Sequence, residues 1–405
     1  MAMKKKAVTG MRDILPEEME VRNYVLSVIR DTYRSYGFSA IETPHVEHLE
    51  NLLSKQGGEN EKLIFKILKR GEKLDLSGPT TEEAVSDCGL RYDLTLPLSR
   101  YYACHQSELP SPFKALQIGS VFRADRPQRG RFRQFTQCDI DILGEASWIA
   151  ETDLILATSR ALSNLGFKDF TIRINDRKLL KATADKAGFT EDQYEQIFII
   201  LDKMDKIGEE GVREELGNTF GQDKTDAYIA LLKEDPKALI EETGSSLTEI
   251  IAAVEKAKST DFRIVYDPTL VRGMGYYTGP IFEISMDEYG GSVGGGGRYD
   301  EMIGRFTGQN TPAAGFSIGF ERIIMLLMER GFQVPGEHRK CAFLIDKKMP
   351  KERMTDIWAE AEKLRREGIT VDIAQMKKNR KFQKEQLEKN GYTEIRDFYS
   401  ESLQH

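Results

Sequence analysis

Five arginines stand close together in residues 122–135, FRADRPQRGRFRQF, although the 405-residue chain has a formal net charge of −7. A guanidinium group presents a planar fork of donors that matches the oxygens of a phosphate or a carboxylate. The Arg-Pro-Gln-Arg-Gly stretch inside the cluster has the composition of a turn. Two strands joined by this turn could hold a small phosphate with Arg123 and a nucleic-acid backbone with the turn arginines. A solvated basic hairpin explains the same pattern, so both interpretations stay open here.

Three segments around the cluster alternate polar and apolar residues, which puts the polar ones on one face of a strand. The segments are RYDLTLPL, QIGSVFRAD and QFTQCDIDILG. A half-solvated antiparallel sheet would account for any one of them, but three together favour the floor of a polar pocket. The polar residues on these faces are Asp93 and Thr95, Arg123 and Asp125, and Gln137, Asp139 and Asp141.

Two further tracts deserve separate interpretations. The glycine-rich GGSVGGGGRYD lacks the Lys-Ser/Thr of a P-loop, so residues 291–297 are expected to form a tight loop between antiparallel strands. In VRGMGYYTGP, Tyr276 and Tyr277 follow Arg272, and core packing is the ordinary role of such a pair. The histidines and cysteines are scattered, without the spacing of a metal site or a catalytic triad, so no protein-bound metal is expected.

The elements that must position these residues form a mixed α+β pattern. Apolar residues at helical spacing predict a helix over 17–36, and short alternating segments over 90–145 predict an antiparallel sheet. A strand running into an apolar helix is expected in TPAAGFSIGFERIIMLLMERG, and a βαβα unit near the C-terminus. The expected division is a core at 1–175, a helical insertion at 176–258, the rest of the core at 259–333, and a small α/β domain at 338–405.

The composition excludes several classes of protein. Apolar residues make up 40% of the chain and charged residues 30%, as in ordinary globular proteins. The first residues, MAMKKKAVTG, lack the apolar stretch of a secretory signal, and no apolar run is long enough to span a bilayer. Four well-separated cysteines fit a reducing compartment. We therefore expect a cytoplasmic protein with no membrane partner.

Taken together, these segments resemble the histidyl-tRNA synthetases, a family of class II aminoacyl-tRNA synthetases. The resemblance covers most of residues 8–330 in the family's order. It is carried by GMRDILPEE, by YGFSAIETPHVE as motif 1, by RYDLTLPLSRY, by FRADRPQRGRFRQFTQCDIDILG as motif 2, by the histidine-specific VRGMGYYTG and GGRYD, and by AAGFSIGFERI as motif 3. It implies a class II antiparallel sheet flanked by helices, with a helical insertion and a C-terminal anticodon-binding-like α/β domain.

The resemblance also implies a function and a set of site residues. The implied activity is ATP-dependent attachment of histidine to its tRNA through a histidyl-adenylate, with Mg²⁺ bound mainly through the ATP phosphates. Arg123 and Arg272 would flank the α-phosphate as the catalytic residues. The implied ATP-binding residues are Arg123, Asp125, Phe135 and Arg322; the implied histidine-binding residues are Asp93, Thr95, Arg123, Gln137, Asp141, Arg272, Tyr276 and Tyr277; and the implied tRNA-binding residues are Gln128, Arg129 and Arg131.

The sequence departs from the family's pattern in three respects. Asp93, Asp125 and Asp141 stand where other members often have glutamate, which shortens the reach but keeps the charge. Gly275 stands where the tyrosine segment usually has an acid, and the C-terminal unit is expected to end at TEIRDFYSESLQH, short of the later strands. A non-catalytic, histidine-sensing regulatory subunit of ATP phosphoribosyltransferase is the alternative, but such proteins lose the ATP-site arginines that are present here. The motif 1 segment with Pro44 further implies a homodimer.

Overall fold

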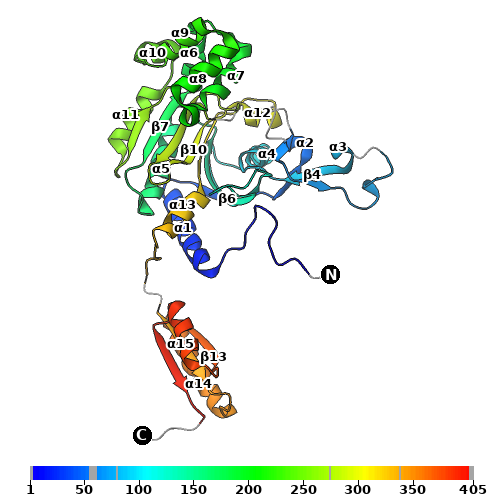
Figure 1. Cartoon of the computed structure of the whole chain (residues 1–405), viewed down its shortest axis with the longest axis vertical. Coiled ribbons are helices and arrows are strands. Elements are labelled where there is room, and N and C mark those ends of the chain that lie inside the picture. Colours follow the sequence, from blue (N-terminus) through cyan, green and yellow to red (C-terminus); the bar gives the residue numbers. More distant parts are fainter. Residues whose placement is uncertain (1–2, 54–61, 79–80, 273–274, 337–338, 401–405) are drawn as a thin grey trace. The chain divides into compact units, whose positions relative to one another are not determined.

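The computed structural model describes residues 3–53, 62–78, 81–272, 275–336 and 339–400. These form two compact units, Met1–Phe332 and Gln333–His405, each with its own sheet (Figure 1). The division of the first unit into a core and an insertion stays a prediction. No helix among the described residues is long and apolar enough to cross a membrane.

An eight-stranded, mostly antiparallel sheet forms the centre of the first unit, as expected from the alternating segments. Only the two edge pairs, β1 with β5 and β7 with β8, are parallel. Long strands β5 and β6 pair over their whole length and place the arginine-rich turn at their joined ends. In spatial order the strands are β1 (Ser39–Ile41), β5 (Phe113–Phe122), β6 (Gln134–Leu143), β11 (Ala313–Ile318), β10 (Gly291–Arg298), β9 (Pro280–Met286), β7 (Thr171–Asp176) and β8 (Arg263–Tyr266).

Helices cover the apolar side of this sheet. Helix α1 (Pro16–Ser35) begins at a proline, which suits a first helical turn, and buries Val25, Ile29 and Tyr33. It packs against α5 (Ile149–Asn164) and α13 (Phe320–Glu329). Because these helices take one side of the sheet, the polar residues of the strands are left to line a cavity on the other.

The region 176–258 is helical, as the sequence predicts, and its buried residues share one apolar cluster with the sheet region. Its buried residues include Phe198, Leu216 and Tyr228, and the same cluster continues into Val271 and Ile281 of the sheet region. The helices are α6 (Arg177–Lys186), α7 (Tyr194–Leu201), α8 (Met204–Phe220), α9 (Gln222–Leu231), α10 (Lys237–Thr243) and α11 (Leu247–Ala257), with a short 3₁₀ turn, η3 (Glu191–Gln193).

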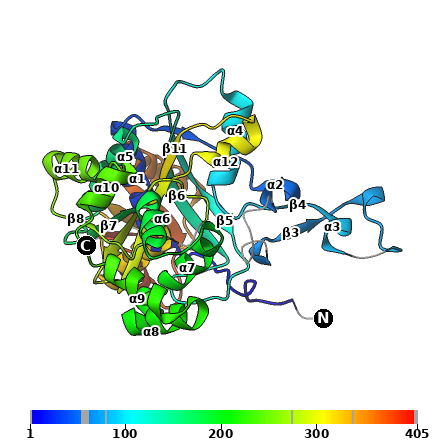
Figure 2. The same ribbon diagram turned by 90° about the horizontal axis from the view of Figure 1, so that it is seen from above.

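A small three-stranded antiparallel sheet extends away from the large one (Figures 1 and 2). Its central strand pairs with both neighbours. It consists of β2 (Val46–His48), β4 (Ser86–Leu90) and β3 (Lys66–Leu68), with the short helices α2 (Leu49–Leu52), η2 (Gly71–Lys73) and α3 (Glu82–Val85).

The expectation that RYDLTLPL forms a strand is wrong. Helix α4 (Thr95–His105) begins inside it, and α4 packs on α12 (Glu301–Thr307). Asp93 Oδ1 accepts a hydrogen bond from the backbone N–H of Leu96 at 3.1 Å, which satisfies a free donor of the first turn. Pro97 fits that turn because it has no N–H to leave unpaired. The alternation of the segment reflects a capped helix start, and Asp93 and Thr95 do not share a strand face.

The second unit is a parallel α/β domain that contains one strand more than expected. The order is β13 (Thr370–Gln375), β12 (Lys340–Ile345), β14 (Glu394–Phe398), with α14 (Lys351–Arg366) and α15 (Arg380–Lys389) in the crossovers. Strand β14 lies in the segment from which no strand was expected. Its last residue, Phe398, packs against Phe343 of β12 with ring centroids 4.9 Å apart.

Candidate active site

A cavity of about 580 Å³ opens on the polar side of the large sheet, and it gathers most of the predicted site residues. Two of the three residues predicted to bind tRNA lie outside its lining: Gln128 pairs with Arg131 across the turn, and exposed Arg129 donates to Glu329 at 2.5 Å. The predicted residues that line the cavity are Asp93, Thr95, Arg123, Asp125, Arg131, Phe135, Gln137, Asp141, Arg272, Tyr276, Tyr277 and Arg322.

Strand β6 supplies the acidic end of the cavity. Gln137, Asp139 and Asp141 line it, while Cys138 and Ile140 between them are fully buried on the other face, as the period-two pattern predicts. Asp141 Oδ1 accepts a hydrogen bond from Tyr299 Oη at 2.5 Å. Asp141 Oδ2 and Gln137 Oε1 are buried, and neither has a hydrogen-bond partner within the described part of the chain. Two buried acceptors of this kind suit a ligand that brings N–H donors.

Burial and mutual repulsion raise the pKa values of these acids. Burial raises the pKa of Asp139 to about 7, opposed by the hydrogen bond that Ser317 donates to it and reinforced by the charge of Asp93. Burial, and then the charge of Asp139, raise the pKa of Asp141 well above its usual range. A cationic ligand would favour the ionised acids, which makes this end selective for positive charge.

The alternation of the QFTQCDIDILG segment places Asp139 on the polar face of its strand, but Asp139 is not among the predicted site residues. Its position between two predicted residues of the same face was the signal that could have identified it. Tyr299, which orients Asp141, sits in the GGRYD segment and was not predicted either. The predicted tyrosines lie beside it, with ring centroids 4.6 Å apart for Tyr276 and Tyr277 and 6.2 Å for Tyr276 and Tyr299. The aromatic group closes the acidic end.

Arg123 lines the cavity, and its guanidinium is held by its surroundings. Its Nε donates to the carbonyl of Tyr92 at 3.0 Å, and its guanidinium lies over the rings of Tyr92 at 4.1 Å and Phe135 at 5.1 Å. Stacking holds the plane of the group, and the carbonyl of Tyr92 takes up only its Nε donor. Such a group can meet an anion without first reorganising.

Arg272 faces the same cavity from the other side, and its conformation is unusual. Its φ of 59° lies in the left-handed region, which costs a non-glycine residue on the order of 1–3 kcal/mol. Its Nη1 donates to Glu283 of β9. Burial by itself lowers the pKa of Arg272, but the charge and hydrogen bond of Glu283, together with Tyr277 and Tyr276, outweigh this effect and the pKa is raised. The cavity therefore contains a permanently charged second arginine. Glu283 was not predicted, although a lone acid in the apolar strand PIFEISM was a usable signal.

The expected loop at 291–297 is instead strand β10, in the middle of the sheet. Its glycines are explained by close approach of other groups. A Cβ on Gly295 would lie 2.5 Å from Cζ of Arg272, and one on Gly296 would lie 1.9 Å from the carbonyl oxygen of Gly315. Glycine weakens a strand but permits such contacts. Strand β10 is therefore the surface on which the guanidinium of Arg272 lies.

The hairpin end of the cavity carries Arg322 and the Asp125–Arg131 ion pair. Arg131 Nη2 lies 3.0 Å from Asp125 Oδ1, and Arg322 Nη1 donates to the carbonyl of Ser292. The turn itself is closed by reciprocal backbone hydrogen bonds between Gln128 and Arg131 at 3.0 and 3.2 Å, with Gly130 at φ 68°. The turn therefore closes a hairpin, which both interpretations of the arginine cluster share, and one of its arginines, Arg131, lines the cavity.

Two unpredicted features support or extend the site. Buried Glu321 accepts from Arg22 at 2.7 and 2.8 Å and from the backbone N–H of Thr136 at 3.1 Å, which ties α1 to α13 and β6. Asp202 and Lys206, at the junction of α7 and α8, line the cavity from the helical region. No residue pattern in the helical sequence pointed to these two.

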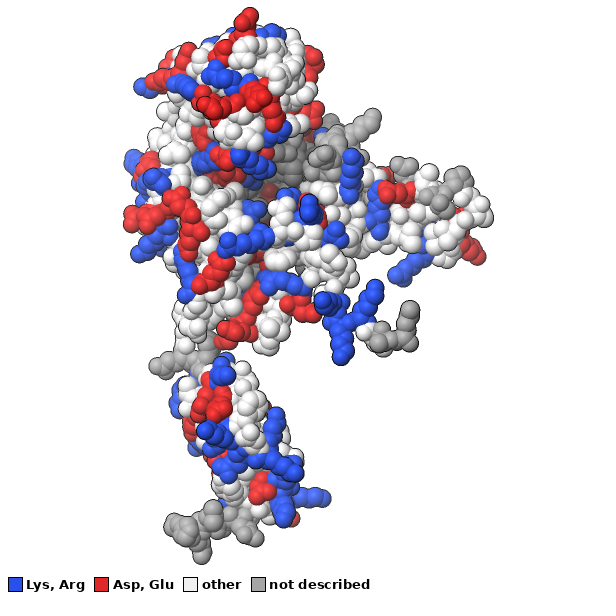
Figure 3. Space-filling model, viewed as in Figure 1, with Lys and Arg blue, Asp and Glu red and all other residues white. Residues whose placement is uncertain are grey.

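Charges of both signs are interspersed over the first unit on the face shown in Figure 3. Within the described residues, no group of three or more His, Cys, Asp or Glu side chains is placed to hold a metal ion. The positively charged side chains that line the cavity are Arg123, Arg131, Arg272, Arg322 and Lys206.

Comparisons with known proteins agree with this architecture. A family model described as histidyl-tRNA synthetase matches residues 10–323. A histidine–tRNA ligase from Leifsonia xyli is 46% identical over 344 residues, 78% of this chain and 79% of that protein. One from Christiangramia forsetii is 39% identical, over 82% and 78%. The crystal structure of histidyl-tRNA synthetase from a Nostoc species aligns with a TM-score of 0.77 at 30% identity, over 96% and 90%.

The antiparallel sheet, with arginines and acids facing one cavity, defines a class II aminoacyl-tRNA synthetase. Within that class, the matched family model and the relatives assign the chain plainly. The chain belongs to the histidyl-tRNA synthetase family. A Bacillus halodurans structure described as an ATP phosphoribosyltransferase regulatory subunit/histidyl-tRNA synthetase aligns with a TM-score of 0.76 at 20% identity, which shows the shared fold alone.

Proposed function

We propose that this chain joins histidine to ATP as histidyl-adenylate and then transfers the histidyl group to tRNA(His). The observation that carries the proposal is the pair of unpartnered buried acceptors, Asp141 Oδ2 and Gln137 Oε1, in a cavity that also contains Arg123 and Arg272. The two buried acceptors require a ligand with N–H donors, and the two arginines require an anion. Histidine and the α-phosphate of ATP together supply both.

The acidic end selects the amino acid. An imidazole N–H donates to Asp141 Oδ2, with Tyr277 on the ring, and the α-ammonium lies among Asp93, Thr95 and Gln137. A side chain without a ring N–H leaves Asp141 buried and unpaired, which costs more than a missing apolar contact would. Tyr299 keeps the other oxygen of Asp141 occupied, so one acceptor is directed at the ligand.

The arginines promote the first chemical step. A carboxylate oxygen of histidine attacks the α-phosphorus in line, the bond to the bridging oxygen breaks, and pyrophosphate leaves. Negative charge on the non-bridging oxygens is met by Arg123 and Arg272, which are already charged and aimed. In the second step a ribose hydroxyl at the tRNA 3′ end attacks the histidyl carbonyl and AMP leaves. The adenine would lie between Phe135 and Arg322, with Asp125 beside it.

Mg²⁺ is proposed to enter with ATP, bound mainly through the phosphates. The carboxylates nearest the arginines fit this arrangement because they are engaged in ion pairs, Asp125 with Arg131 and Glu283 with Arg272. The ion would neutralise charge on the leaving pyrophosphate.

The remaining partners are also proposed. The acceptor end of the tRNA is approached by Gln128, Arg129 and Arg131. A homodimer forms through the motif 1 segment. The protein acts in the cytoplasm, where four free thiols are stable.

Histidine-dependent exchange of labelled pyrophosphate into ATP tests this proposal, with Arg272→Ala as the control. Exchange that requires histidine and disappears in the variant supports an adenylate-forming enzyme. Histidine binding by calorimetry without any exchange would overturn it and point to a histidine-sensing regulatory role.

A further inference from the structure

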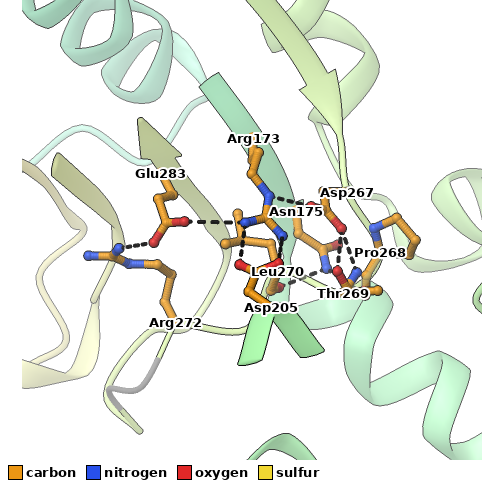
Figure 4. A network of polar contacts seen from close by, with 9 residues as sticks. All are labelled: Arg173, Asn175, Asp205, Asp267, Pro268, Thr269, Leu270, Arg272 and Glu283. Carbon is orange, nitrogen blue, oxygen red and sulfur yellow. Dashed lines mark hydrogen bonds and ion pairs between the residues drawn. The ribbon is translucent and has the colours of Figure 1, made fainter. Parts of the chain in front are cut away.

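A network of ion pairs connects Arg272, which lines the cavity, to Asp205 of the helical region (Figure 4). Its centre is Arg173 on β7, a side chain that faces three carboxylates and is only 17% exposed. Nη1 of Arg173 lies 3.4 Å from Glu283 Oε1 and 2.7 Å from Asp205 Oδ2, and its Nε donates to Asp267. Burial lowers the pKa of Arg173, but the hydrogen bonds and charges of Asp205 and Asp267 together outweigh this effect. The pKa is raised, so the group stays charged.

The first route from Arg173 to the cavity runs through Glu283. Arg173 and Glu283 are direct neighbours across the antiparallel pair β7–β9. One carboxylate oxygen of Glu283 faces Arg173 and the other accepts from Arg272. A glutamate shared in this way cannot turn both oxygens to Arg272. Arg173 thereby leaves part of the Arg272 fork available for a phosphate oxygen.

The second route fixes the backbone that leads to Arg272. Asp267 accepts from the backbone N–H of Thr269 at 2.9 Å and from its hydroxyl at 2.6 Å. Asn175 Nδ2, on the same strand as Arg173, donates to the carbonyl of Leu270 at 3.0 Å. Leu270 is two residues from Arg272, whose positive φ needs such restraint to persist.

The third carboxylate, Asp205, belongs to the first turn of α8. The adjacent Lys206 lines the cavity, and Gly208, three residues after Asp205, breaks the helix with φ 70°. Asp205 is 67% exposed, so its ion pair is the one link of the network that can open without disturbing the sheet. It connects the helical region to the arginine that faces the α-phosphate.

We propose that Arg173 is a positioning residue for Arg272 in adenylate formation, and that Asp205 makes this positioning responsive to the helical region. The proposal rests on the proposed function. Arg173 does not line the cavity, so it acts on the reaction only through Glu283 and the 267–270 turn. Its loss should lower the rate of the chemical step, in which charge develops on the α-phosphate, by far more than it weakens the binding of histidine, to which Arg272 is also expected to contribute.

The test compares Arg173→Gln, Arg173→Lys and Asp205→Asn in single-turnover adenylate formation, with histidine affinity measured by calorimetry. Because a displacement on the order of 1 Å can cost on the order of 100-fold in rate, we expect Arg173→Gln to slow the step at least about tenfold. Histidine affinity should change less than about twofold. Arg173→Lys should recover part of the loss, and Asp205→Asn should show a smaller loss of the same kind. Arg213→Gln is the matched control, because it removes an ion pair to Asp226 within the helical region.

A double-mutant cycle decides whether Arg173 acts through Arg272. On an Arg272→Lys background, Arg173→Gln should add less than about threefold, because residues in one network are non-additive. Independent, multiplicative losses would overturn the proposal, as would a loss of histidine affinity with an unchanged rate. If Arg173→Gln does not fold, Asp205→Asn and Arg173→Lys give the same comparison. Failure of the unmodified protein to form adenylate would refute the proposed function instead, so the two failures are distinguishable.

Discussion

Gly295→Ala should disable the site while leaving the fold intact. A Cβ at this position would meet Cζ, Nη1 and Nη2 of Arg272 at 2.5 to 2.7 Å, and these are the three nearest heavy atoms. Ordinary contact begins at 3.4 Å, so the guanidinium has to withdraw by about 1 Å. Such a displacement costs on the order of 100-fold in the rate of adenylate formation. The obstacle is the end of a side chain, so we expect the free energy of unfolding to change by no more than about 1 kcal/mol.

The assay for this variant is histidine-dependent pyrophosphate exchange beside urea-induced unfolding. Gly291→Ala in the same strand is the control, because its Cβ would meet only the Tyr289 ring, at an ordinary 3.8 Å. Exchange by Gly295→Ala within about threefold of the unmodified protein would refute the idea that the position of Arg272 limits the reaction. Unfolding of the variant together with lost exchange would show that the glycine serves the sheet rather than the arginine.

Three other outcomes follow from contacts described above. Arg298→Ala leaves the fully buried Glu151 unpaired and should destabilise the first unit by about 3–5 kcal/mol in urea unfolding, whereas an effect below 1 kcal/mol would mean that the pair is dispensable. The pKa of Asp139 is about 7 in the folded state and exceeds its unfolded value, so the folded state binds more protons between about pH 4 and pH 7 and the free energy of unfolding falls as pH rises. Asp139→Asn should flatten this part of the curve of unfolding free energy against pH, and an unchanged slope would contradict the raised pKa. Arg129→Gln should weaken tRNA binding and reduce the slope of log affinity against log salt by about 1, and an unchanged slope in filter binding would remove Arg129 from the tRNA contact.

The large sheet and the site on β6 could be predicted because their signal is local. Alternation alone placed Gln137, Asp139 and Asp141 on one face, and the structure confirms it. Alternation failed in RYDLTLPL, since Asp93 there caps a helix, and a cap produces the same polar-apolar order as a strand. Over a few residues the two periods cannot be told apart.

Contacts between residues that lie far apart in the chain could not be predicted from the sequence. The sequence predicts a loop for the glycine-rich tract that forms β10, and only the distances to Arg272 and to the carbonyl of Gly315 explain its glycines. Glu283 and Arg173 face each other by strand register, which no local pattern specifies. Strand β14 was missed because its partner, β12, lies some fifty residues earlier in the chain.

Two of these missed contacts, the approach of Arg272 to Gly295 and the pairing of Glu283 with Arg173, concern the placement of one arginine. A cation stabilises a developing charge cheaply only when it is already in position before the reaction starts. An arginine side chain has several rotatable bonds, so its position has to be imposed from outside. Here the strained backbone at φ 59°, the shared Glu283 and the glycine floor of β10 each remove part of that freedom. Gly295→Ala and Arg173→Gln each perturb one of these restraints. The two losses in the rate of adenylate formation therefore measure how much the glycines of β10 and the shared Glu283 each contribute to the position of Arg272.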